Sequence, residues 1–185
     1  MQQITTLLTN FNISLQANKN AGGALGRKND DGNGLTENKR KKDIKLVCTA
    51  LFLNNNQIRT IKGLNDVLQF VMFNPSKLEW LDLSYNYLQN IDKELLNFPN
   101  LKTLYLHGNY IQNLEEARKL QDLPNLQTLN LYGNFIEQIK GYRLWILGMM
   151  YEKHETLKKL DNVLITRKEF DTVIVWNERL FESKK

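Results

Sequence analysis

The sequence reads LEWLDLSYN at residues 78–86, LKTLYLHGN at 101–109 and LQTLNLYGN at 126–134. These segments share the pattern L-x-x-L-x-L-x-x-N, and each has a further apolar residue two positions after the asparagine. An earlier segment, CTALFLNNN at 48–56, fits the pattern with Cys48 in the first apolar position. The four asparagines are separated by 30, 23 and 25 residues, and they are Asn56, Asn86, Asn109 and Asn134. The chain is therefore built from a repeated unit.

This unit is the leucine-rich repeat, which predicts an α/β solenoid with parallel strands on the concave face and short helices and turns on the convex face. In each short strand alternate side chains face opposite sides, so the second and third leucines of the pattern point into the core. The asparagine amide can satisfy backbone groups that lose their partners where the chain turns away from the strand. We expect stacked copies of it to form a ladder that supports the fold.

Apolar residues after each turn are expected to close the core from the convex side. The pairs are Ile58 with Ile61, Leu88 with Ile91, Ile111 with Leu114, and Ile136 with Ile139. The first unit is longer, and an apolar face at Leu64, Val67, Leu68 and Val71 predicts a helix that ends before Asn74–Pro75. Residues 115–121 are the next helical candidate.

We divide the chain into a low-complexity tail at 1–45, four repeats at 46–140 and a C-terminal cap at 141–185. Within the cap, residues 141–147 read as a helix and 157–161 as a degenerate fifth strand. Thr166 and Glu169 have the spacing of a capping box, which predicts a last helix. The apolar residues of that helix are Phe170, Val173, Ile174, Leu180 and Phe181. The open end of a solenoid needs such a lid.

The basic charge of the chain belongs to the tail. The 185 residues carry a net charge of +5, and residues 1–45 hold +4 of it, with 8 Lys and Arg against 4 Asp and Glu. The repeats are nearly neutral and lack the broad basic surface typical of nucleic-acid binding. A mean hydropathy of −0.47 and the lack of a long apolar run exclude a membrane-spanning helix. The single cysteine, Cys48, cannot form an internal disulfide, which suits a reducing cytosol.

Two features of the tail are candidates for contact. A weak amphipathic helical stripe is formed by Ile4, Leu7, Leu8, Phe11 and Leu15. From residue 16 onward the tail has almost no large apolar residue, so we expect a flexible linker, mostly disordered unless bound. Its basic cluster is either solvated linker charge or a contact for an acidic surface such as tubulin, phosphate or nucleic acid. That cluster is Lys39, Arg40, Lys41 and Lys42.

The residues give no sign of catalysis. His107 and His154 are the only histidines, and metalloprotease, dinucleotide-binding and phosphate-loop motifs are absent. Cys48 occupies a core position, which favours burial over nucleophilic use. The outward Asp82 and Asp161 each lack a matched carboxylate. We expect no enzyme, no cofactor and no metal site.

Binding is therefore assigned to the outward strand positions of the concave face. The expected contact residues are Phe52, Asn54, Trp80, Asp82, Tyr105, His107, Asn130 and Tyr132. A diagonal aromatic stripe is formed by Phe52, Trp80, Tyr105 and Tyr132, and exposed rings of this kind are typical of interface hot spots. Alternatively, neighbouring rings only stack on each other across the sheet. These positions lack Arg and Lys, which favours a protein ligand over RNA.

The C-terminal residues resemble a known cap. Tyr142–Arg143, Leu160–Asp161, Thr166 and Glu169 are similar to the cap of short cytosolic leucine-rich-repeat proteins, such as the spliceosomal U2 A-prime protein and phosphatase-binding and dynein-associated members. The strings LFLNNN at 51–56, LDLS at 81–84, LYLHGN at 104–109 and KGYR at 140–143 resemble the leucine-rich repeat-containing protein 51 family more closely. This resemblance covers about residues 46–176.

That family is small, intracellular and associated with ciliated cells. The resemblance implies a cytoplasmic, ciliary or axonemal adaptor that binds tubulin, dynein-associated or other ciliary proteins on its concave face, with the tail as a second tether. No small-molecule substrate, membrane or nucleic acid is expected as a partner. The alternative is a nuclear ribonucleoprotein adaptor resembling the spliceosomal protein, with a basic tail that touches RNA.

Overall fold

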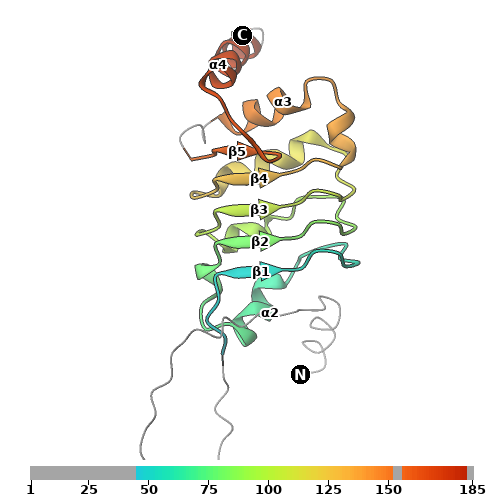
Figure 1. Cartoon of the computed structure of the whole chain (residues 1–185), viewed down its shortest axis with the longest axis vertical. Helices are drawn as coiled ribbons and strands as arrows, with labels where there is room; N and C mark the ends of the chain where they lie inside the picture. The colour runs from blue at the N-terminus through green and yellow to red at the C-terminus, as the bar shows by residue number, and fades with distance from the viewer. Residues whose placement is uncertain (1–44, 152–155, 183–185) are drawn as a thin grey trace, which may run out of the picture.

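The computed structural model describes residues 45–151 and 156–182, with side chains described as far as Trp176. Its strands lie one above another in a single six-stranded sheet, with the helical segments behind it (Figure 1). In spatial order they are β1 (Ala50–Phe52), β2 (Trp80–Asp82), β3 (Thr103–Tyr105), β4 (Thr128–Asn130), β5 (Lys159–Leu160) and β6 (Val163–Leu164). Neighbours pair in parallel from β1 to β5, and β6 returns antiparallel to β5. The expected α/β leucine-rich-repeat solenoid is confirmed.

The core runs through the stack because each strand places the same leucine at the same register. Leu51 pairs with Leu81, and the column continues through Leu104, Leu129 and Leu160. All five side chains are buried. The residue on either side of each leucine then points outward, as alternation along a strand requires. We call this outward side of the sheet the concave face.

The convex side carries one α-helix and short 3-10 helices. The helix predicted in the long first unit is α2 (Leu64–Val71), which buries Leu64, Val67 and Leu68. The 3-10 helices are η1 (Pro75–Lys77), η2 (Lys93–Asn97), η3 (Leu114–Asp122) and η4 (Phe135–Gln138). Three of them begin at Asn74, Asp92 or Asn113, whose side-chain oxygen accepts from the backbone N–H two residues later. These caps satisfy donors that a helix start leaves unpaired.

Three expected core positions are less buried than the pattern predicts. Ile139 is 39% exposed, because the chain turns there through Gly141 (φ 76°) into α3 (Tyr142–Met149). That helix covers the end of the core instead, with Ile146 and Leu147 fully buried. Leu114 and Cys48 are half-buried against the core. Cys48 precedes β1, the first strand of the described sheet, and its partial burial raises the pKa of its thiol.

The C-terminal cap closes the β5 end of the stack, where the side chains of Tyr142 and Asp161 form hydrogen bonds. Tyr142 donates from its hydroxyl to Asp161 Oδ2 at 2.9 Å, while Asp161 Oδ1 accepts from the backbone N–H groups of Leu131 and Tyr132 at 2.7 and 3.0 Å. Burial, followed by the neighbouring Asp161 carboxylate, raises the pKa of Tyr142, so it remains a donor. The fifth strand therefore attaches to the fourth repeat through both backbone and side chains.

Helix α4 (Arg167–Glu182) follows the expected capping box. Thr166 N–H donates to Glu169 Oε2 at 2.9 Å, and Glu169 N–H donates to Thr166 Oγ1 at 3.3 Å. The helix buries Val173, while Phe170 and Ile174 are half-buried. The side chains of Leu180 and Phe181, the Ile4–Leu15 stripe and the Lys39–Lys42 cluster lie outside the described residues.

Candidate functional site

Three ladder asparagines hold neighbouring repeats together beneath the candidate surfaces. Asn109 is representative: its Nδ2 donates to Leu106 O in its own repeat at 2.9 Å and to Leu83 O in the preceding repeat at 3.0 Å. Its Oδ1 accepts from Leu88 N–H at 3.0 Å. Asn86 and Asn134 make the equivalent bonds one repeat earlier and later. The ladder therefore fixes where the strands end and where the following side chains point.

Asn56, the first ladder residue, bonds within its own turn. Its Nδ2 donates to Leu53 O at 3.0 Å and to Asn54 O at 3.1 Å. The Asn54 side chain is half-buried at the end of β1. This edge of the sheet is therefore shaped by the turn of the first repeat.

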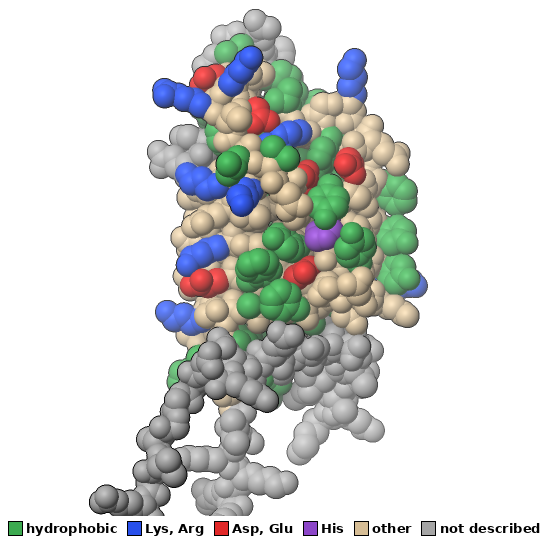
Figure 2. Space-filling view, viewed as in Figure 1, with side chains coloured by type: hydrophobic (Ala, Val, Ile, Leu, Met, Phe, Trp, Pro, Cys, Tyr) green, Lys and Arg blue, Asp and Glu red, His purple; other side chains and the backbone are tan. Residues whose placement is uncertain are grey.

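The first candidate surface is a row of rings across the first three strands. Phe52 and Trp80 have ring centroids 6.1 Å apart, and Trp80 and Tyr105 lie 5.4 Å apart in an edge-on arrangement. Phe52 and Trp80 nevertheless remain 39% and 37% exposed. The rings thus pack against one another across the sheet in tilted and edge-on arrangements, and they still present apolar surface. Hydrophobic side chains gather at the centre of this face around the histidine (Figure 2).

The row continues into a cluster that we call the aromatic box, made of Tyr85, Tyr105, His107 and Tyr132. The His107 ring stacks on Tyr132 at 4.5 Å and meets Tyr85 and Tyr105 edge-on at 5.1 and 5.6 Å. Backbone bonds hold these turns side by side, because Tyr85 N–H donates to His107 O and Gly108 N–H donates to Tyr132 O. The box therefore draws on three consecutive repeats.

His107 forms the floor of the box and is only 8% exposed. Burial lowers its pKa, while Asp82 and Asp161 oppose that shift, so the imidazole is neutral at pH 7. Its Nδ1 atom is buried and has no hydrogen-bond partner within the described part of the chain. His107 is therefore less exposed than its outward position predicted, because the three tyrosines enclose it.

Asp82 lies beside the box at the register of Phe52 and Tyr105. Its Oδ1 accepts from Ser84 N–H at 2.9 Å and from Ser84 Oγ–H at 2.6 Å. Ser84, an outward position of the pattern, is thereby buried, while Asp82 stays half-buried at the surface. The structure thus brings the carboxylate next to the aromatic row.

Asn130 occupies the outward strand position expected of it, but it is not available for contact. This side chain is 1% exposed, and it exchanges two hydrogen bonds with Asn162 in the turn between β5 and β6. Its Nδ2 donates to Asn162 Oδ1 at 2.9 Å, and its Oδ1 accepts from Asn162 N–H at 3.1 Å. The cap folds over this end of the concave face, so Asn130 fastens the cap and does not face a partner.

A second aromatic row, which we call the edge row, lies beyond the C-terminal ends of the strands. The sequence reasoning missed it. Tyr87 and Tyr110 stack at 5.5 Å, and Tyr110 and Phe135 lie 5.9 Å apart. Each ring directly follows a ladder asparagine, a recurrence that is visible in three consecutive copies of the pattern. All three are exposed, and Arg59 lies 5.9 Å from the centre of the Tyr87 ring.

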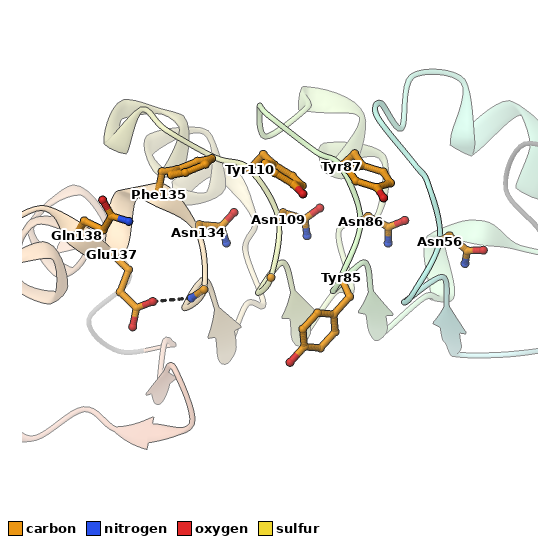
Figure 3. Close-up of a pocket in the computed structure, with 12 residues that line it drawn as sticks. Asn56, Tyr85, Asn86, Tyr87, Asn109, Tyr110, Asn134, Phe135, Glu137 and Gln138 are labelled. Carbon is orange, nitrogen blue, oxygen red and sulfur yellow. Dashed lines mark hydrogen bonds between the residues drawn. The ribbon is translucent and has the colours of Figure 1, made fainter.

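Between this edge row and Tyr85 runs a groove of about 490 Å³. Figure 3 shows Tyr85 on one side, the rings of the edge row on the other and the ladder asparagines between them. Gly108 (φ 66°) lines the groove, and a Cβ there would come within 2.6 Å of the Tyr85 ring. At one end Glu137 Oε2 accepts from Gly133 N–H at 2.6 Å. Tyr85 therefore borders both the groove and the aromatic box.

The side chains at these surfaces can form apolar contacts and hydrogen bonds with another molecule. Among residues 45–151 and 156–182, no group of three or more His, Cys, Asp or Glu side chains could hold a metal ion. Over the same ranges, no helix has the length and apolar character to span a membrane. What the concave face offers is ring surface, a carboxylate and a buried imidazole.

Comparisons with known proteins place the chain among relatives of the same architecture. The family model for the leucine rich repeat matches residues 61–111 and 76–136. Leucine-rich repeat-containing protein 51 of Homo sapiens and that of Mus musculus are each 39% identical to this chain over 152 residues, which is 82% of this chain and 77% of the relative. The relative from Macaca mulatta is 40% identical over the same shares.

Two solved structures share the fold. A chain of the Drosophila melanogaster SNF/U2A' complex aligns with a TM-score of 0.51 and 20% identity, covering 77% of this chain and 94% of that one. A chain of the Chaetomium Mex67:Mtr2 subunits aligns with a TM-score of 0.51 and 22% identity, covering 69% and 91%. At these identities the likeness concerns the fold alone.

Proposed function

The chain belongs to the family of leucine-rich repeat-containing protein 51, and on that premise we propose that it is a non-catalytic adaptor whose concave face holds a partner protein in a ciliary, axonemal assembly. The observation that carries the proposal is the partly exposed ring row of Phe52, Trp80 and Tyr105 on the concave face of the hydrogen-bonded sheet. Rings held in place before binding lose little freedom when a partner covers them.

The energetics of the row suit a protein ligand. Aromatic side chains carry much of the binding energy at protein interfaces, and they act best at the centre of a contact, surrounded by polar groups. Here Asp82 lies within the row and the Glu79–Lys102 ion pair, with a nitrogen–oxygen distance of 3.0 Å, lies at the N-terminal ends of the strands. The face therefore has an apolar centre and a charged rim.

The place in the cell is supported by family resemblance. The resemblance described in the sequence analysis implies association with ciliated cells, and the single half-buried thiol of Cys48 suits the reducing cytoplasm. Tubulin, dynein-associated proteins and other ciliary proteins are the partners that this role requires. The tail at residues 1–45 would add a second tether, which raises avidity when both attachments can form together.

A nuclear ribonucleoprotein adaptor is the second candidate, and it rests on the resemblance of the cap residues to the spliceosomal U2 A-prime protein. The shared fold with a chain of the SNF/U2A' complex is compatible with it. The outward positions of β1 to β4 hold no Arg or Lys, whereas single-stranded RNA is held by basic grooves with stacking rings. The rings are present and the basic groove is not. We therefore place the ciliary adaptor first.

Crosslinking mass spectrometry on isolated cilia tests the proposal. The full chain, tagged and expressed in ciliated cells, should be enriched in the axonemal fraction and should crosslink to a fixed set of proteins. A Trp80→Ala, Tyr105→Ala double variant should lose those crosslinks while keeping its abundance. Nuclear enrichment with ribonuclease-sensitive crosslinks would replace the ciliary role with the second candidate.

A further inference from the structure

The aromatic box contains a polar atom whose partner is missing from the described residues. His107 Nδ1 is buried without a hydrogen bond, although buried polar atoms in folded proteins are nearly always bonded. The imidazole lies at the centre of the concave face, and three tyrosine rings surround it at 4.5 to 5.6 Å. A neutral imidazole nitrogen can accept a hydrogen bond, so the missing group can be a donor from a bound partner.

Negative charge lies beside the box. Asp82 lies at the register of Tyr105, two residues before His107, and Asp161 accepts a hydrogen bond from the backbone N–H of Tyr132 in the box. The oxygens of Asp161 are bonded to Leu131, Tyr132 and Tyr142. Asp82 Oδ1 takes both bonds from Ser84, so Oδ2 is the oxygen left to meet a ligand.

Positive charge on the same face is kept away from the box. Lys159 occupies the register column of Trp80, Thr103 and Thr128. His107 lies four residues further along its strand direction than Thr103, which is about 13 Å at the rise of an extended chain. A cation at the box is therefore attracted by Asp82 and not repelled at close range by Lys159.

These features together select a cationic side chain. The faces of tyrosine rings are negative and attract a cation held close to them. Lysine and arginine are donors only, so either can bond the Asp82 carboxylate while its charge lies against the tyrosine rings. His107 Nδ1 is buried, so a tyrosine ring must move aside before the same side chain can donate to it. A carboxylate ligand would face Asp82 unfavourably, and an apolar one would leave His107 Nδ1 unpaired.

We propose that the aromatic box of Tyr85, Tyr105, His107 and Tyr132 receives a Lys or Arg side chain from a basic segment of the partner protein, with its charge beside Asp82. The inference rests on the proposed adaptor function and assigns the chemistry of the partner at the same face. Trp80 and Phe52 then cover the apolar residues that flank the inserted cation.

The chain's own basic cluster is a competing source of such a side chain. The described chain starts at Lys45, whose Nζ donates to Gln69 O of α2 at 2.7 Å, and Leu46 pairs with Met72 just after that helix. The chain therefore enters the first repeat on its α2 side, two repeats away from His107. Lys39 to Lys42 lie three to six residues, about 10 to 20 Å of extended chain, before Lys45, and that chain joins the first repeat on its helix side and not on the concave face. This geometry favours a partner over the tail.

Histidine-selective NMR on the full chain tests the inference. Only two histidines exist, so a His154→Gln variant assigns the ring signals of His107. The probes are acetyl-arginine amide and its neutral isostere acetyl-citrulline amide, at matched ionic strength. The arginine probe should shift the His107 signals in a saturable way, and the citrulline probe should not.

Two matched variants locate the effect. Asp82→Asn should weaken the arginine response about fivefold, the size of a modest charge contribution. Asp171→Asn, which neutralises an exposed carboxylate on α4, should leave it unchanged. Equal responses to both probes, or no response to arginine, would overturn the inference.

The remaining outcomes separate the two sources and the two proposals. In the full chain without probe, the His107 signals could already lie at the shifted, arginine-bound position. If they leave that position only when Lys39, Arg40, Lys41 and Lys42 are changed to Ser, the tail is the occupant and the partner assignment fails. If the probes fail while partner crosslinks still depend on Trp80 and Tyr105, the adaptor function stands without the cation. If those crosslinks do not depend on the rings but the arginine response is seen, the adaptor proposal fails instead.

Discussion

Arg143 donates from Nε to Glu169 Oε1 at 2.6 Å, and this ion pair joins α3 to the start of α4. The same arginine donates from Nη1 to Leu160 O on β5 at 2.8 Å. Glu169 is also the carboxylate of the capping box with Thr166. One pair of side chains therefore links the fifth strand and both cap helices, and the Arg143 guanidinium holds the pKa of Glu169 below its usual value.

Glu169→Gln should lower stability in a pH-dependent way. A lowered pKa in the folded state means that the ionised carboxylate stabilises the fold at neutral pH. That stabilisation is lost as the pH falls from the ordinary Glu value of 4.5 through the lower folded value. We expect a difference of about 1 kcal/mol or less at pH 7, closing at lower pH, in thermal unfolding of the two proteins.

The exposed Glu115–Arg118 pair is the matched control for this measurement. Its side chains are 58% and 54% exposed, so Glu115→Gln should change the melting temperature little at any pH. A Glu169→Gln deficit that stays constant between pH 7 and pH 3 would contradict a carboxylate role.

Leu106→Ala should be strongly destabilising. This side chain is 1% exposed and packs between neighbouring repeats, so its loss opens a cavity and should cost about 2 to 5 kcal/mol. Urea unfolding measures the difference. Leu164→Ala, at a leucine that is 62% exposed on β6, is the control and should have a small effect. Equal unfolding midpoints for the two variants would refute the strand register.

Asn109→Ala should damage folding more than binding. The change removes an amide that bonds Leu83 O, Leu106 O and Leu88 N–H and leaves these buried groups unpaired. We expect a loss of about 2 to 4 kcal/mol in the free energy of unfolding. Asn125→Ala removes an exposed amide that bonds only Pro99 O among the described residues, and it should cost much less.

Trp80→Ala with Tyr105→Ala should leave the fold intact yet weaken partner capture. Both rings point out of the sheet, whereas Leu81 and Leu104 beside them form the core. Aromatic anchors at interfaces cost about 2 kcal/mol or more on truncation, which is roughly a thirtyfold loss of affinity. Pull-down from ciliary extract, with circular dichroism as the fold check, measures both properties.

The edge row supplies the control for that experiment. Tyr87→Ala with Phe135→Ala also deletes two exposed rings, from the groove side of the sheet. We expect this variant to capture the partner normally. Normal capture by the Trp80, Tyr105 variant together with loss in the edge variant would move the binding site to the groove.

Removing residues 1–44 should leave the repeats folded and weaken attachment to axonemes. The deletion keeps Lys45, which bonds Gln69 O, and takes away the Lys39–Lys42 cluster. If that cluster grips an acidic lattice, attachment should also become less dependent on salt, because exposed charges are screened over about 8 Å at physiological ionic strength. Retention on isolated axonemes across a salt series measures this.

Two full-length variants separate charge from apolar docking in the tail. Changing Lys39, Arg40, Lys41 and Lys42 to Ser should reproduce the deletion if charge dominates. Leu8→Asp with Phe11→Asp should do so instead if the apolar stripe dominates. Full retention of the 1–44 deletion would reduce the tail to a passive linker.

The repeat pattern was enough to predict the fold. Leucines spaced by two and three residues decide locally which side chains point inward, because alternation along a strand depends only on the backbone. The long first unit with its helix and the capping box at Thr166 were readable for the same reason, since both signals lie within a few residues. Residues 141–147 and 157–161 were readable as cap elements from the pattern, whereas Tyr142 and Asp161 were singled out within them by resemblance.

Tertiary structure alone decided which outward positions remain available. The surroundings of an outward side chain come from neighbouring repeats and from the cap, which a local pattern does not describe. Asn130 is covered because Asn162, in a turn 32 residues later, folds over it, and His107 is enclosed by rings from three repeats. The edge groove exists because stacking aligns Tyr87, Tyr110 and Phe135, which are distant in sequence, along one side of Tyr85. Sequence determined the direction of each side chain, and packing between repeats determined its exposure.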